Sequence, residues 1–570
     1  MAMTTEGWGR PFRRTFVVLA AACTSGAAAQ TILIPPALDA SQPVTLTLQP
    51  GEHSFDGGPA TMTLGANGPV LGPTLIVHRG DFADWTVVNA LDDSTTLHWH
   101  GMHVAAHHDG GPYTPIAPGA TWNPEFTVLD PAGTFWYHPH LHHMTEHQVA
   151  MGLAGQIWVR DPVEQALPLP QTYGVDEFPI VLQTKDFDAM GMVLAGTNAD
   201  DVPMANATVG GTLPVPASVV RLHLLNGASQ RVFQLGFTGD LPFHLIATDG
   251  GLLPAPVERT RLRLAPGERA EILLDCTGLE GTTFDLMSFA SELPSATYGA
   301  AQPGMGPGMV LTGYAGNPLN GNDFSFMTLA VGPAAPDAIF AVPSVLDPSH
   351  VVPWSAGDVT RGFTFSPSTM GPNALNNPFL INGASFAMDV INFEVQLGDV
   401  EVWQIANNSP IGHPFHVHNT PFYLLDRNGV APGPEEAGLK DVVFVPAMQS
   451  VRIIMQFNDF ADPVMPYMYH CHMLVHEDGG MMGAFVVVDP AAEVVETASD
   501  LCGWAVPNPA RETVRIGGLT GYTRVVGPTG KLVREFAALP SGTSLDCTGF
   551  AAGVYVAVDT AGRSVRFVLE

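Results

Sequence analysis

Four pairs of histidines, each pair separated by one residue, dominate the chemistry that this sequence could support. They are His98/His100, His138/His140, His416/His418 and His470/His472. Side chains two apart on a strand point to the same face, so each pair can present two imidazoles together. Imidazole is the commonest metal ligand near neutral pH, although a lone pair of histidines is often only polar surface. Four pairs in the outer thirds of a chain with 21 histidines predict a metal centre.

Cys471 lies between the two histidines of the last pair. If His470 and His472 point to one face of a strand, the thiol of Cys471 points to the other. This segment would then stand between two different metal sites, one using the thiolate and the other using the imidazoles.

The thiolate site can be completed from nearby residues. A cysteine with two histidines and a long, weak axial methionine is the ligand set of a blue-copper electron-transfer centre. His413 is the spare histidine of its motif, and His476 and Met481 follow Cys471 in the same loop. We expect Met481 to be the axial ligand and Met482 to be a packing neighbour. Zinc is the alternative, but its chemistry does not call for a thioether at this spacing.

Eight histidines remain once that site is subtracted, and they suit a polynuclear cluster. A division into sets of two, three and three would hold three copper ions with open positions for dioxygen. The eight are His98, His100, His138, His140, His416, His418, His470 and His472.

The elements that position these residues read as strands. β-branched and aromatic residues alternate with polar ones, and Gly, Pro, Asn or Asp closes most runs, for example at 74–91, 219–237, 261–275 and 400–408. We predict an all-β fold of sandwiches or barrels. Proline-rich breaks divide the chain into domains at 30–163, 172–340, 341–492 and 501–570.

The remaining composition bounds the partners and the compartment. A net charge of −31 argues against binding nucleic acid or an anionic membrane. Residues 1–29 have the basic, apolar, small-residue order of an export signal, too short for stable membrane insertion, and either the general or the twin-arginine route fits. Of the five cysteines, Cys276 reads as a buried thiol, and Cys502 and Cys547 could pair.

The four motifs together resemble the signatures of the multicopper oxidases. They are HWHG (98–101), WYHPH (136–140), HPFHVH (413–418) and HCHMLVHEDGGMM (470–482). The resemblance covers residues 31–490 and implies three cupredoxin-like β-sandwich domains. Residues 501–570 read separately as a small C-terminal β-sandwich. Bacterial laccase-like and cuprous-oxidase members are the most similar, through DGGPYTPIAPG (109–119) and QVAMGLAG (148–155).

The resemblance also implies four copper ions and their ligands. One type 1 ion would take His413, Cys471, His476 and Met481, and one type 2 ion would take His98 and His416. The two type 3 ions would take His100, His138 and His472, and His140, His418 and His470. Two acids, Asp109 and Glu477, match residues that deliver protons to the cluster in that family; the plain alternatives are a turn aspartate for Asp109 and hydrogen-bonded surface for Glu477.

Some features depart from the cuprous-oxidase pattern or stay open. The segment 365–389 holds only Met370 and Met388 where those enzymes carry a methionine-rich insert, and Ser409 stands where an acid is expected. Met305 and Met309 are expected to be loop residues rather than a copper site. A second group of histidines could recruit copper or be solvated surface: His103, His107, His108, His142, His143 and His147.

The tail, residues 501–570, resembles a type IX secretion sorting domain, with a generic β-sandwich as the alternative. The resemblance implies contact with the secretion machinery and a protein that is secreted or held at the cell surface after a periplasmic stage; a periplasmic protein is the alternative.

The expected activity is a laccase-like oxidoreductase. Single electrons from phenols or aromatic amines would enter at the type 1 copper and reduce O2 to water, with the chain from Cys471 to His470 and His472 as a short electron path. Alternatives are a metallo-oxidase of Cu(I), Fe(II) or Mn(II), and a copper-binding or electron-transfer protein without turnover.

Overall fold

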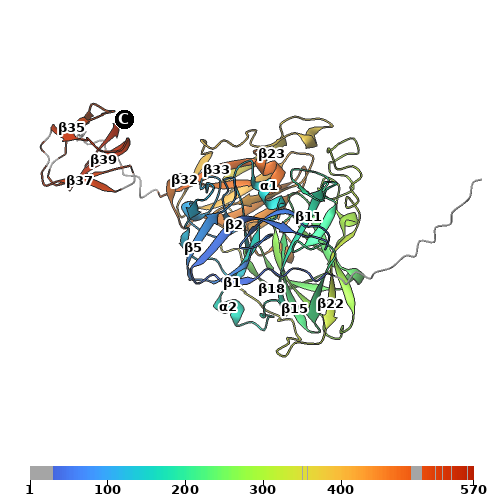
Figure 1. Cartoon of the computed structure of the whole chain (residues 1–570). Coiled ribbons are helices and arrows are strands. Elements are labelled where there is room, and N and C mark those ends of the chain that lie inside the picture. The colour runs from blue at the N-terminus through green and yellow to red at the C-terminus, as the bar shows by residue number, and fades with distance from the viewer. Residues whose placement is uncertain are drawn as a thin grey trace, which may run out of the picture. The chain divides into compact units, whose positions relative to one another are not determined.

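The computed structural model describes residues 30–349, 351–355, 357–489, 504–519, 521–528, 531–538, 540, 542–560 and 563–570. The chain forms two compact units, residues 1–490 and 491–570 (Figure 1). The expected all-β class is confirmed, with three cupredoxin-like sandwiches in the first unit and a small sandwich in the second. The expected signal, residues 1–29, lies outside the described residues.

The first sandwich holds strands from residues 37 to 160. Trp85 of one sheet and Trp99 of the other meet edge to face with ring centroids 4.7 Å apart, so large buried rings fill its core. One sheet runs β1 (Ala37–Asp39), β4 (Thr74–His78), β10 (Gly155–Arg160), β9 (Gly133–His138), β6 (His98–His100). The other runs β3 (Thr61–Ala66), β2 (Val44–His53), β5 (Phe82–Asn89), β7 (Thr121–Trp122), with β8 (Glu125–Thr127) on β5.

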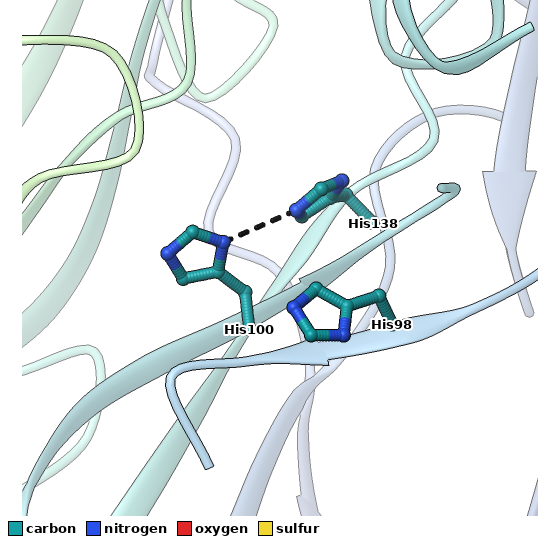
Figure 2. Close-up of side chains that lie close together, drawn as sticks. All are labelled: His98, His100 and His138. Carbon is teal, nitrogen blue, oxygen red and sulfur yellow. Dashed lines mark hydrogen bonds between the residues drawn. The ribbon is translucent and has the colours of Figure 1, made fainter. Parts of the chain in front are cut away.

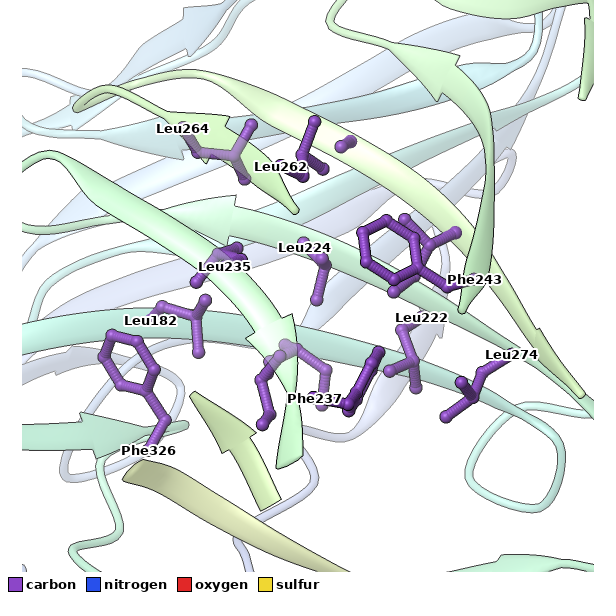
Figure 3. Close-up of a cluster of buried hydrophobic side chains, with 14 of the residues drawn as sticks. Leu182, Leu222, Leu224, Leu235, Phe237, Phe243, Leu262, Leu264, Leu274 and Phe326 are labelled. Atoms are coloured by element: carbon purple, nitrogen blue, oxygen red, sulfur yellow. The ribbon is translucent and has the colours of Figure 1, made fainter. Parts of the chain in front are cut away.

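The second sandwich holds strands from residues 193 to 332 together with β11. Figure 3 shows leucine and phenylalanine side chains of both its sheets meeting in one cluster. One sheet runs β12 (Val193–Leu194), β11 (Glu177–Phe187), β15 (Val219–Asn226), β20 (Arg269–Asp275), β17 (Phe243–Thr248), β18 (Gly251–Arg259), with β13 (Val202–Ala205) on β11. The other runs β14 (Gly211–Pro216), β22 (Phe324–Gly332), β21 (Thr283–Ser288), β16 (Phe233–Phe237), β19 (Leu262–Leu264). Cys276 is fully buried in this core as a free thiol, as expected.

The third sandwich holds strands from residues 361 to 488. Its core contains Cys471 and Met481 among phenylalanines and valines, so two of the residues expected at the thiolate site are part of the hydrophobic core. One sheet runs β24 (Phe379–Ile381), β23 (Arg361–Pro367), β26 (Val400–Asn407), β31 (Ser450–Gln456), β28 (Phe422–Arg427), β29 (Leu439–Lys440). The other runs β25 (Phe393–Gln396), β33 (Met482–Val488), β32 (Asp462–Cys471), β27 (His413–Val417), β30 (Val442–Val445).

Helices are few and short, and no helix among the described residues is long and apolar enough to cross a membrane. The α-helices are α1 (Thr145–Ala150), α2 (Pro162–Gln165) and α3 (Leu474–Asp478). The 3-10 helices are η1 (Ala106–His108), η2 (Thr238–Asp240), η3 (Ala290–Glu292), η4 (Ala374–Asn376) and η5 (Pro434–Glu436). The expected domain limits at 163, 172, 340 and 341 remain predictions.

The tail unit has its own core, in which Val514, Val525, Tyr555 and Phe567 are buried. Its sheets run β34 (Trp504–Val506), β35 (Thr513–Gly517), β38 (Thr543–Asp546), and β37 (Leu532–Phe536), β36 (Thr523–Val526), β39 (Gly553–Asp559), β40 (Ser564–Leu569). Cys547 is a buried free thiol; its expected partner Cys502 lies outside the described residues.

Candidate metal centre

The mononuclear site forms where β27 begins, β32 ends and α3 follows. The Sγ atom of Cys471 lies 3.5 Å from Nδ1 of His413 and 3.8 Å from Nδ1 of His476, and the two Nδ1 atoms lie 3.2 Å apart. The structure therefore brings together three of the four ligands expected from sequence, and these three form a group able to hold a metal ion.

Backbone hydrogen bonds hold Met481 beside this group. Its N–H donates to the carbonyl of His476 at 2.9 Å, and its carbonyl accepts from the N–H of Cys471 at 3.0 Å. The side chain is fully buried in the same cluster as Cys471. This places Met481 in the right neighbourhood for an axial ligand, whereas Met482 packs in a separate cluster with Met468.

Ser409 fixes the tautomer of His413. The hydroxyl of Ser409 donates to the carbonyl of Ile411 at 2.8 Å, so its oxygen accepts from Nε2–H of His413, also at 2.8 Å. The Nδ1 atom of His413 is then a bare lone pair facing Cys471. The residue that stands where an acid is expected therefore orients His413 through its hydroxyl.

The protonation states of the histidines and the cysteine at this site favour cation binding. Burial lowers the pKa of His413 well below its ordinary value and that of His476 to about 3, so both imidazoles are neutral at pH 7. Burial raises the pKa of the Cys471 thiol above its ordinary range, so a thiolate there requires a bound cation to stabilise it.

The eight other histidines converge where the first and third sandwiches meet, and their inward nitrogens form two close sets of three. In the first set, Nδ1 of His100 lies 3.3 Å from Nε2 of His138 and 3.2 Å from Nε2 of His472; Figure 2 shows the first of these contacts.

The second set surrounds Nε2 of His470. This atom lies 3.1 Å from Nε2 of His140 and 3.3 Å from Nε2 of His418. The last two histidines, His98 and His416, each bury an Nε2 atom that has no hydrogen-bond partner.

Backbone carbonyls show that three of these inward nitrogens carry no proton. Nδ1 of His98, His138 and His416 each lies 2.8 Å from a carbonyl oxygen, belonging to Asp109, Pro139 and Asp441 in turn. A carbonyl only accepts, so each Nδ1 carries the hydrogen and each Nε2 is a bare lone pair.

Carboxylates fix two further rings in the same way. Nε2 of His100 donates to Asp441 Oδ1 at 3.0 Å, and Nδ1 of His418 donates to Asp109 Oδ2 at 2.8 Å. The close contact of His100 with His138 therefore joins two lone pairs with no proton between them. Lone pairs at such distances repel unless a cation lies between them, so the donor set fits bound metal ions.

Burial keeps the imidazoles neutral, as metal ligation requires. It lowers the pKa well below the ordinary value for His100, His138, His140, His416 and His472, and it lowers that of His418 to about 4. Neutral imidazoles with open lone pairs suit copper, as they also suit zinc, iron and nickel.

The two expected acids both touch the outer nitrogens of the cluster. Asp109 is nearly fully buried and accepts a hydrogen bond from His418. Glu477 is fully buried; its Oε1 lies 3.3 Å from Nδ1 of His140, and its Oε2 lies 3.3 Å from Nδ1 of His470. Burial opposes ionisation, but these imidazoles outweigh it and hold the pKa of both carboxyls well below the usual range. The alternative of Glu477 as surface is wrong.

One part of the strand argument needs correction. Only His98 and His100 lie wholly within a strand, β6; in the other three pairs the second histidine follows the end of β9, β27 or β32. The pairs share direction only loosely, because the chain turns there. The opposite orientation of Cys471 and its flanking histidines holds, since their side chains enter different groups.

The second histidine group stays apart from the centre. His142 and His143 stack with ring centroids 3.6 Å apart, and His103 and His107 contact Asp459 and Asp462. Among the described residues, none of the six belongs to a group of ligand atoms close enough to hold a metal. Copper recruitment thus has no geometric support.

Asp441 was not predicted from the sequence. Its side chain accepts a hydrogen bond from His100, and its backbone carbonyl accepts one from His416. It follows Lys440 just before β30 and has no motif spacing to the histidines, so no signal in a single sequence marks it.

Known proteins similar to this chain belong to one family. Two multicopper oxidase family models match residues 47–164 and 359–491. A "Multicopper oxidase mco" of Staphylococcus haemolyticus is 30% identical over 458 residues, covering 78% of this chain and 88% of that protein. "Cell division protein FtsP" of Sodalis glossinidius is 32% identical, covering 80% and 91%.

A solved structure is similar to this chain in fold as well as in sequence. The laccase-like multicopper oxidase CueO from Ochrobactrum sp., described with activity towards lignin model compounds and lignosulfonate, is 32% identical with a TM-score of 0.69, covering 80% of this chain and all of that one. The chain belongs to the multicopper oxidase family. It is an oxidoreductase, and the family implies copper, an electron donor and O2.

Proposed function

We propose that the protein is a laccase-like oxidase that takes single electrons from small neutral aromatic molecules, such as phenols or aromatic amines. The observation that carries the proposal is the convergence of lone-pair nitrogens with one thiol in two adjacent buried sites. Copper bound there would accept electrons one at a time and reduce O2 to water.

The proposed ligands follow the groups described above, with four copper ions. Type 1 copper would be held by His413, Cys471, His476 and Met481, and type 2 copper by His98 and His416. The type 3 ions would be held by His100, His138 and His472, and by His140, His418 and His470. Asp109 and Glu477 would move protons, because they are buried carboxylates in contact with the cluster histidines.

The surface beside His476 supports an organic substrate. His476 is the one proposed ligand that is only partly buried, and its ring lies 4.6 Å from that of Phe379. The segments 293–322 and 362–388 contain no charged residue, in a chain of net charge −31. They meet through Val310 and Asn376, and Leu375 packs in the cluster of Cys471.

This neutral surface also carries exposed apolar side chains, including Val310 and Met370. Mn(II) prefers carboxylates and Fe(II) binds carboxylates together with imidazoles, and these segments contain neither. Exposed thioethers at Met305 and Met370 are the one observation that favours the alternative substrate Cu(I).

Oxygen consumption by the copper-loaded protein tests the proposal. We expect a neutral phenol and an aromatic amine to support turnover at least about tenfold faster than Fe(II) or Mn(II), because only the former can desolvate against an uncharged surface. Faster turnover with Cu(I) than with any organic donor would instead establish a cuprous oxidase, and no consumption with any donor would leave a copper-binding protein without turnover.

We further propose that residues 501–570 are a type IX secretion sorting domain and that the protein is exported through the periplasm to the cell surface or medium. The separate compact unit with its own core supports a detachable role. Deleting residues 491–570 should retain the protein in the periplasm with full oxidase activity, as fractionation would reveal. Unchanged export of the truncated chain would remove the sorting role and favour a generic sandwich.

A further inference from the structure

The middle sandwich offers none of the expected copper ligands, yet one of its turns touches the cluster. The turn joins β19 to β20 through residues 265–268. Gly267 has φ +83°, and a Cβ atom built on it would lie 2.9 Å from the ring of His472. Backbone without a side chain therefore lies directly against this imidazole.

Arg269 follows the turn and is 1% exposed. Every N–H group of its guanidinium has a hydrogen-bond acceptor. Its Nη1 and Nη2 donate to the two oxygens of Asp441 at 2.6 and 2.5 Å. The other three N–H groups donate to the carbonyls of Thr134, Gly267 and Asp249 at 2.9, 3.0 and 3.0 Å. All five donors are used, so this guanidinium has one geometry and joins all three sandwiches.

Burial alone would favour neutral arginine, but the carboxylate of Asp441, followed by Asp249 and Glu268, raises the pKa of Arg269 above its ordinary value. Arg269 is therefore a permanent cation, and the carboxylate that it holds can act only as an acceptor toward the cluster.

Asp441, held in place by Arg269, accepts hydrogen bonds from two cluster histidines. Its Oδ1 accepts from Nε2–H of His100 at 3.0 Å, and its carbonyl accepts from Nδ1–H of His416 at 2.8 Å. His100 thus directs Nδ1 inward, although the other cluster histidines with a settled tautomer direct Nε2 inward. Without the hydrogen bond to Asp441, no contact would favour the tautomer of His100 that has a bare Nδ1 facing the cluster.

We propose that Arg269 and Gly267 are positioning residues of the copper cluster: Arg269 acts through Asp441 to set the tautomer and direction of His100, and Gly267 holds the ring of His472. The inference rests on the proposed function, because it assigns these residues to the copper sites. It makes the ligand-free middle domain a necessary part of the cluster.

Arg269→Gln tests this, with Arg231→Gln as the matched control. Arg231 lies in the same sandwich, is equally buried and pairs with both oxygens of Asp200 at 2.9 and 2.7 Å, but that pair does not contact the cluster histidines. The measurements are copper bound per chain at limiting free copper, the thiolate absorption of the mononuclear site, and thermal unfolding.

We expect Arg269→Gln to weaken cluster copper about 10- to 100-fold while the thiolate absorption stays. Arg269→Lys should recover part of the loss, because it restores charge without the fork. Arg231→Gln should keep both sites. Wild-type loading of Arg269→Gln, or equal loss of both sites in Arg269→Gln and Arg231→Gln, would overturn the inference. If the wild-type chain itself binds no copper cluster, the proposed function fails instead.

Gly267→Ala keeps every ion pair and gives a second test should Arg269→Gln fold poorly. Its control is Gly281→Ala, because Gly281 has nearly the same φ of +81° with open space around it. We expect loss of cluster copper only in Gly267→Ala. Equal loading in the two variants would show that the contact with His472 positions nothing.

Discussion

Cys471→Ser is expected to abolish both the blue thiolate absorption and the oxidase activity, while copper stays bound at the cluster histidines. A serine hydroxyl is a poor copper ligand at neutral pH, and the two lone pairs of His413 and His476 alone make a weak site. The side chains have similar volumes, so packing around the fully buried residue 471 is kept.

The measurements are the visible spectrum, copper per chain and oxygen consumption with a phenol. Burying a hydroxyl without a partner costs roughly 1–3 kcal/mol, so thermal unfolding must be followed as well. Cys276→Ser is the matched control, because Cys276 is equally buried in the core of the middle sandwich. That variant should keep colour and activity. Retention of both properties in Cys471→Ser would contradict the mononuclear site.

Glu477→Gln is expected to lower turnover by about 10²-fold with the thiolate absorption and the copper content unchanged. The carboxylate oxygens lie 3.3 Å from the outer nitrogens of His140 and His470, and reduction of O2 to water would consume protons in this buried place. Because the pKa of Glu477 is held well below its usual range, the group is ionised at neutral pH and would bind an incoming proton only transiently before passing it to the cluster. Glutamine cannot bind a proton in this way.

The pH profile and the solvent isotope effect distinguish proton transfer from simple orientation of the histidines. Glu146→Gln is the control, because Glu146 is a buried carboxylate nearby that hydrogen-bonds Ser229 rather than a cluster histidine. Normal turnover in Glu477→Gln would exclude the proton role. Copper loss in proportion to activity would make Glu477 a positioning residue.

Local spacing was enough to predict which side chains the structure brings together, because a metal site needs particular side chains at short intervals. Cys471 between His470 and His472 indicated two sites, and the number of spare histidines indicated how many nitrogens each could have. Strand alternation was less reliable at His140, His418 and His472, which follow strand ends where the chain turns. Periodicity cannot locate those ends to within a residue.

Long-range contacts could not be predicted from one sequence. Arg269 and Asp441 are separated by 172 positions and lie in two different sandwiches, so their pairing depends on how complete domains dock. Ser409 was noted only as a departure from a pattern; the structure shows its hydroxyl orienting His413. The neutral segments were readable in the sequence, but their proximity to His476 required the fold.

Each set of three cluster nitrogens draws on both ends of the first unit. His140 and His470 are 330 positions apart, and His100 and His472 are 372 apart. A bound ion would therefore act as a cross-link that closes a very long loop of chain, as a disulfide does, and would restrict the unfolded chain correspondingly. Stability would then depend on free copper by mass action, so that copper starvation would lower the free energy of unfolding of the first unit.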